Sequence, residues 1–155
     1  MPQLKENVFL SLQLFDEKLV ADNFYWLSAK PEIHDYVNNK WYVTPIKQYA
    51  DFKGLANIAG SELNITTASK EESGKTVLSV ELENPSSSIA FFTQLLLKDE
   101  KGEIIYPALW CDNYISLLPG EKRTLECALD ISLTGKKATL NVSGWNTMKQ
   151  IIEIK

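Results

Sequence analysis

The sequence predicts an all-β protein, namely an immunoglobulin-like antiparallel β-sandwich with an extra β-hairpin at its N-terminus. Apolar and polar residues alternate with a period of two along most of the chain, whereas the helical period is almost absent. Clusters of turn-forming residues separate the alternating runs at spacings of about 8 to 12 residues, as in sandwich folds. Apolar residues make up 45% of the 155 residues, which suffices for a core of ordinary size.

The first predicted element is a hairpin within residues 8–27. Val8, Leu10, Leu12 and Leu14 alternate with a second set of side chains, and the polar turn at 16–18 leads into another extended run. An exposed apolar strand of this kind is expected to pair with, or pack against, another surface. We therefore expect the hairpin either to fold back onto the rest of the chain or to mediate a dimer.

The sandwich strands follow in order after residue 62. A hairpin is predicted from Leu63, with a turn at 72–75 and a return strand to residue 83. After the break at 84–88, an apolar strand over 89–98 and a strand over 103–110 are expected. The remaining strands are predicted to include 114–118, Leu125 to Leu129, Ala138 to Val142 and Ile152 to Ile154.

Residues 23–52 follow neither period well, yet they hold half of the chain's aromatic residues. A flexible linker would be poor in aromatic side chains, so this segment is predicted to pack against something. We accordingly expect two parts. Residues 1–43 would be the end of a preceding sandwich domain plus an aromatic-rich joint, and residues 44–155 would be the immunoglobulin-like domain.

Charge and composition exclude several classes of partner and cofactor. The net charge of -4 is spread without long blocks of one sign, which excludes nucleic acid as an expected partner. No run approaches the roughly 18 apolar residues of a membrane span, so no membrane partner is expected. Two cysteines, Cys111 and Cys127, are too few for a disulfide scaffold and are predicted to be free thiols.

Motifs for chemistry are missing from the sequence. His34 is the single histidine, so it is predicted to be a surface or capping residue rather than a catalytic one. Metal, phosphate-cradling and dinucleotide motifs are absent, and the carboxylates fall at turns or on polar strand faces. We predict no catalytic residues, no metal ligands and no cofactor.

Aromatic side chains remain as candidates for binding, because sugar rings stack on flat groups. Trp41, Trp110, Tyr114 and Trp145 are the candidates for carbohydrate contact. The alternative is that these residues fill the core or an interdomain contact, and their exposure decides between the two. Asp112 and Asn113, which precede Tyr114, are predicted to bond their own backbone as the chain reverses.

Several motifs together resemble the C-terminal immunoglobulin-like domain of glycoside hydrolase family 2 enzymes of the exo-beta-D-glucosaminidase type, relatives of the beta-mannosidases. Upstream, the stretches NFYWLSAKPEIHDY and YVTPIKQYADF resemble that family's passage from the preceding sandwich into the last domain. The motifs of the sandwich are Asn84-Pro85, Ile89-Ala90-Phe91-Phe92, Pro107, Trp110, Asp112-Asn113-Tyr114 and Leu117-Leu118-Pro119-Gly120-Glu121.

The resemblance implies a large periplasmic or secreted hydrolase whose catalytic carboxylates lie on a central barrel. Such a barrel takes about 250 residues and does not fit into this chain. The resemblance therefore implies a non-catalytic accessory domain whose partners are the barrel and the neighbouring sandwich. Two alternatives stay open from the sequence: a carbohydrate-binding module that stacks oligosaccharide on exposed Trp and Tyr, and an adhesion or assembly domain that works by protein contact.

Overall fold

The structure is a computed structural model that describes residues 7–154, and the chain divides into two compact units between Ile58 and Ala59. The predicted domain boundary at 43/44 stays a prediction; by their contacts, residues up to Ile58 group with the first unit, and Asp51 is bonded to two of its residues. Ser28 Oγ donates to the Asp51 carbonyl at 2.9 Å, and Asp51 N donates to the Lys30 carbonyl at 3.3 Å.

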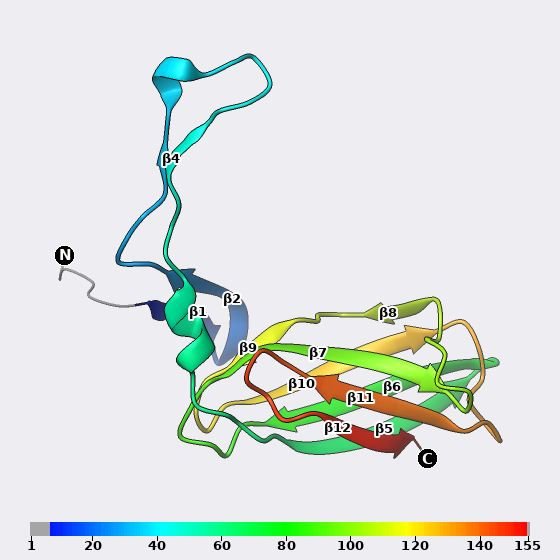
Figure 1. Cartoon of the computed structure of the whole chain (residues 1–155). Helices are drawn as coiled ribbons and strands as arrows, with labels where there is room; N and C mark the ends of the chain where they lie inside the picture. The colour runs from blue at the N-terminus through cyan, green and yellow to red at the C-terminus, as the bar shows by residue number, and fades with distance from the viewer. Residues whose placement is uncertain (1–6, 155) are drawn as a thin grey trace. The chain divides into compact units, whose positions relative to one another are not determined.

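The second unit is the predicted antiparallel sandwich (Figure 1). One sheet has the strand order β5-β6-β10-β8, and the other has the order β12-β11-β7-β9. Their bounds are β5 Asn64–Glu72, β6 Lys75–Glu83, β7 Ala90–Asp99, β8 Ala108–Trp110, β9 Ile115–Leu117, β10 Lys122–Leu129, β11 Ala138–Ser143 and β12 Gln150–Ile154. The prediction of an all-β immunoglobulin-like fold is thus confirmed.

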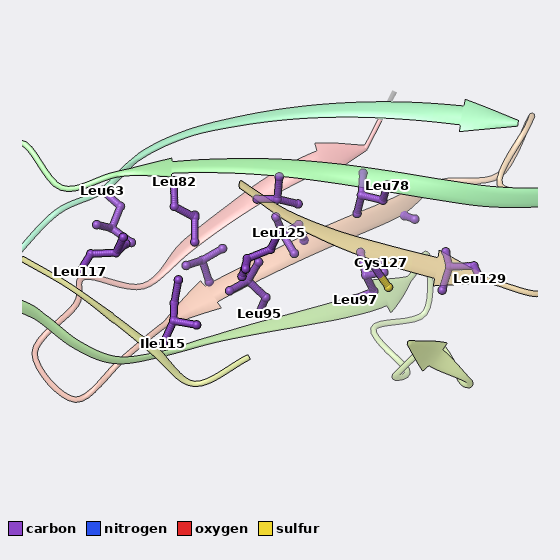
Figure 2. Packing of buried hydrophobic residues seen from close by; sticks show 14 of the residues in the cluster. Leu63, Leu78, Leu82, Leu95, Leu97, Ile115, Leu117, Leu125, Cys127 and Leu129 are labelled. Atoms are coloured by element: carbon purple, nitrogen blue, oxygen red, sulfur yellow. The ribbon is translucent and has the colours of Figure 1, made fainter. Parts of the chain in front are cut away.

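The core lies between these two sheets and is built by the alternation that the sequence displays. Leu78, Leu82 and Leu125 face Leu95 and Leu97 of the opposite sheet, and all of these side chains are buried (Figure 2). Most outward positions of β6 and β10 are polar or charged, with Val77 and Ala128 as exceptions, and these positions alternate with the buried ones. Burial of apolar surface at about 25 cal/mol per Å² makes this core the main source of stability.

The prediction for residues 103–110 is wrong in its length. Only Ala108–Trp110 form a strand there, β8, which pairs with β10. Before it, Ile105 N donates to the Leu97 carbonyl at 3.1 Å, so the chain first follows β7 and then crosses to the other sheet. Pro107 lies at this crossing, and it has no N–H with which to continue a strand ladder.

The first unit contains the predicted N-terminal hairpin, β1 (Val8–Asp16) and β2 (Lys18–Leu27). One face carries Phe9 and Phe24, whose ring centroids lie 5.6 Å apart. The opposite face carries Leu10, Leu12 and Leu14, and all three side chains are exposed. A two-stranded sheet with an apolar exposed face is marginally stable by itself, so this hairpin needs a covering surface.

Beyond the hairpin the first unit continues into a narrow arm, which we define as residues 30–51. Its short strands, β3 (Ile33–His34) and β4 (Ile46–Gln48), pair with each other and enclose the 3-10 turn η1 (Tyr36–Asn38) (Figure 1). A second 3-10 turn, η2 (Lys53–Asn57), follows the arm. Within residues 7–154 the helices are these short turns, and none is long and apolar enough to cross a membrane.

Candidate functional site

The second unit presents an exposed aromatic pair: Phe92 on β7 and Tyr114 immediately before β9. Their ring centroids lie 5.2 Å apart, and the Gln94 amide donates a 2.6 Å hydrogen bond to the Tyr114 hydroxyl. Both residues have positive φ, 55° in each case. This left-handed backbone is unfavourable for a bulky residue and persists only where the surroundings enforce it.

Two side-chain contacts enforce the backbone around this pair. Asn113 Oδ1 accepts from Leu95 N at 2.8 Å while its Nδ2 donates to the Leu95 carbonyl at 2.9 Å, so the amide replaces a strand partner of β7. The pairing of β7 with β9 shifts register between Ala90 and Thr93, which places Phe92 in a bulge. The predicted local bonds are also present: Asn113 N donates to Asp112 at 2.7 Å.

Trp145 lies in a loop next to the same strand, and Asn146 fixes that loop. Trp145 N donates to the Phe91 carbonyl at 2.9 Å. The Asn146 side chain accepts from Phe91 N at 2.8 Å and donates to the carbonyls of Ala59 and Ile89 at 2.7 and 2.6 Å. The Trp145 ring is 60% exposed, so the loop is held in place while this side chain remains accessible.

The structure brings some of the predicted candidates together and separates others. Tyr114 and Trp145 both flank β7, and each is exposed. Trp110 belongs to β8 in the other sheet and packs partly buried against the core, which favours the alternative of a structural residue. Trp41 belongs to the arm of the first unit and is 93% exposed. Phe92 was missed because the run of residues 89–98 is apolar throughout and gives no sign of which side chain faces outward.

The first unit also contains a hollow of about 600 Å³. Of the described residues, those that line it include Asn7, Lys30, Lys53 and one carboxylate residue, Asp51. Glycoside hydrolysis generally uses a pair of carboxylates about 5 to 9.5 Å apart. Among residues 7–154, no second carboxylate lines this hollow.

Several ionisable groups of the described residues have structural partners. His34 lies 3.0 Å from Glu32 and its ring is 5.7 Å from that of Tyr36, on the exposed arm. Glu71 accepts from the Thr76 hydroxyl and from Leu133 N, and the Thr76 bond is the main reason that its pKa is lowered. Within residues 7–154, no group of three or more His, Cys, Asp and Glu side chains is placed to hold a metal ion.

Both cysteines are free thiols, as predicted. Cys111 is exposed, whereas Cys127 is fully buried in the core between the sheets. Burial raises the pKa of Cys127 to about 11, so its thiol is unreactive in the folded protein.

Comparison with known proteins finds relatives of this chain in sequence and in structure. Residues 41–147 match the exo-beta-D-glucosaminidase Ig-fold domain family. The exo-beta-D-glucosaminidase of Streptomyces avermitilis is 37% identical over 139 residues, which cover 87% of this chain and 15% of that protein. The exo-beta-D-glucosaminidase of Hypocrea jecorina is 31% identical, with 98% of this chain and 17% of that protein covered.

The solved structures agree with the sequence comparisons. The crystal structure of the Amycolatopsis orientalis exo-chitosanase CsxA superimposes with a TM-score of 0.81 at 35% identity, over 88% of this chain and 17% of that one. The chain thus spans about one sixth of the length of the relatives it matches. By fold and sequence, the chain belongs to the exo-beta-D-glucosaminidase Ig-fold domain family.

Proposed function

We propose that this chain is a non-catalytic accessory domain of a retaining glycoside hydrolase of family 2, of the exo-beta-D-glucosaminidase or beta-mannosidase type. In this proposal the sandwich is the C-terminal domain, and residues 1–43 are the end of the sandwich domain that precedes it. The domain packs against the catalytic barrel and supports it.

The observation that carries the proposal is the small share of each relative that the chain matches. It covers 15% of the Streptomyces avermitilis exo-beta-D-glucosaminidase, whereas a catalytic barrel takes about 250 residues by itself. A separate observation agrees: among residues 7–154, Asp51 is the one carboxylate that lines the hollow in the first unit, whereas glycoside hydrolysis generally uses a pair.

Hydrolysis of p-nitrophenyl beta-D-glucosaminide tests this proposal directly. The purified 155-residue chain is assayed beside a complete exo-beta-D-glucosaminidase, for example that of Amycolatopsis orientalis. We expect no release of nitrophenol above the buffer rate from the chain. Release that scales with chain concentration and survives further purification would show that the chain carries its own chemistry.

A second candidate function is carbohydrate binding on the sandwich, which the exposed pair Phe92 and Tyr114 favours. Strained backbone at exposed aromatic residues is often found at ligand sites, and Trp145 lies beside the same strand. Titration with chitosan oligosaccharide, monitored by tryptophan fluorescence, tests this function. Saturable binding that Tyr114→Ala weakens and Tyr106→Ala leaves unchanged would support it, and a flat titration to millimolar sugar would exclude it.

A further inference from the structure

The tip of the arm, defined as residues 35–45, exposes an unusual concentration of apolar side chains. Trp41 is 93% and Val37 is 87% exposed, and Tyr36, Tyr42 and Val43 are also exposed. Single exposed apolar residues are ordinary on a protein surface, but a contiguous group of large ones marks an interaction site. These side chains are exposed among residues 7–154, and the expectation that residues 23–52 pack against something stays a prediction.

The tip is fixed in shape although it is exposed. Asp35 N donates to the Pro45 carbonyl at 2.7 Å and closes the base of the tip. The buried Asp35 carboxylate accepts from the Asn38 side chain at 2.6 Å and pairs with Lys47 Nζ at 3.2 Å. The hydrogen bond from Asn38 is the main reason that the pKa of Asp35 is lowered. A surface that is ordered before binding loses little conformational entropy when a partner covers it.

Two of the three aromatic side chains of the tip, Trp41 and Tyr42, lie at the end of a tight turn. Lys40 N donates to the Val43 carbonyl at 2.9 Å and Val43 N donates to the Lys40 carbonyl at 3.1 Å. These two bonds leave Trp41 and Tyr42 at the central positions, and neither residue has the positive φ that would favour Gly, Asn or Asp there. The rings meet edge to face with centroids 5.1 Å apart. The turn therefore accepts two large aromatic residues without backbone strain and presents both of them at its end.

The composition of the tip distinguishes a protein partner from a sugar. Sugar sites combine flat rings with polar groups, but here the aliphatic side chains of Val37 and Val43 contribute to the same surface. The amino sugars after which the matched relatives are named are cationic when protonated, and Lys40 beside Trp41 would repel them. Aromatic side chains amid few charges are typical of the centre of a protein interface.

The comparisons indicate which protein that partner is. The family match begins at Trp41. The second half of the tip, residues 41–45, is therefore part of the domain that defines the family. The matched relatives extend far beyond the part that this chain covers. We propose that the arm tip docks into an apolar groove on the catalytic domain of the same, longer polypeptide. This inference rests on the proposed function, because that function supplies the catalytic domain.

Photo-crosslinking in the longer protein tests the inference. A benzoylphenylalanine replaces Trp41, and the matched control replaces Tyr106, an exposed aromatic residue of the sandwich unit. We expect position 41 to crosslink to peptides of the catalytic barrel and to lose that crosslink when Val37→Asp is added. Crosslinks from position 41 only to a second chain or to added chitosan oligosaccharide, or none at all, would overturn the inference.

A stability comparison separates failure of the inference from failure of the proposed function. Trp41→Ser should leave the Tm of the isolated chain unchanged, because the side chain is almost fully exposed there, and should lower the Tm of the longer protein. An unchanged Tm in both proteins would overturn the docking inference and leave the accessory-domain proposal intact. A chain found to be encoded without any barrel would overturn both.

Discussion

A Cβ atom placed on Gly144 would lie 2.7 Å from Thr147 Oγ1, closer than folded proteins tolerate. It would also lie 2.9 Å from the Phe91 carbonyl oxygen. The Thr147 hydroxyl in turn lies 3.1 Å from that of Thr93, in the buried end of the sandwich. Gly144 is therefore required by the close approach of the loop that carries Trp145 to strand β7.

Gly144→Ala is expected to destabilise the chain by about 1 to 3 kcal/mol, as other overpacked sites do. Gly60→Ala is the matched control, because its nearest neighbour would lie 3.9 Å from the new Cβ atom. Urea unfolding of both variants measures the difference. Equal stabilities for the two variants would contradict the close approach at Gly144.

Acid stability should depend on Glu71. The hydrogen bond from Thr76 holds the pKa of Glu71 below its ordinary value of 4.5, and Leu133 N adds a second bond. Because the folded pKa is the lower one, the stabilisation is complete above the unfolded pKa and is lost as the pH falls through the folded pKa. We expect the free energy of unfolding to fall below about pH 4.5, and less steeply in Glu71→Gln.

Urea unfolding between pH 3 and pH 6 provides the test, with Glu126→Gln at an exposed strand position as the control. The control should keep the slope of the unmodified chain. An identical acid slope in Glu71→Gln would show that the contact of Glu71 with Thr76 does not contribute to stability.

Thiol reactivity should differ between the two cysteines. Cys111 is exposed, whereas Cys127 is buried and its pKa is raised to about 11. Iodoacetamide at pH 8 should therefore modify one thiol in the folded chain and two in guanidinium chloride. Cys111→Ser should abolish labelling of the folded chain. Rapid labelling of folded Cys111→Ser would mean that the core opens far more easily than its packing implies.

The isolated chain should associate through its N-terminal hairpin. Leu12 and Leu14 lie on an exposed face of a two-stranded sheet whose outer edges are open within residues 7–154. Light scattering across a concentration series should show a dimer. Leu12→Lys should shift the chain to monomer, whereas Gln13→Lys, on the other face, should not. A monomer at all concentrations would contradict this use of the hairpin.

The sandwich could be predicted from sequence because each long strand has one face in the core. The alternation at Leu78, Val80 and Leu82 specified both the strand and its buried side. The same rule failed at residues 103–107, where the chain leaves one sheet for the other and no single face is buried. Strand order and the position of the bulge at Phe92 depend on distant contacts that periodicity does not record.

The candidate surfaces were predicted less completely, because exposure and long-range contacts also depend on the folded chain. Aromatic residue type pointed to Trp41, Tyr114 and Trp145, but exposure separates them from Trp110, which packs on the core. Asn113 and Asn146 looked like turn residues in sequence. Their long-range bonds to Leu95 and Phe91 became visible only once the strands were placed side by side.

We propose that residues 59–154 form a self-sufficient scaffold, whereas residues 8–27 and the arm tip are surfaces that the longer protein covers. Amide hydrogen exchange tests it most directly, in the longer protein and in the isolated Leu12→Lys chain. The account predicts slower exchange of the hairpin and of residues 35–45 in the longer protein, with β6, β7, β10 and β11 unchanged. Equal exchange of the hairpin and the arm tip in both proteins would contradict it.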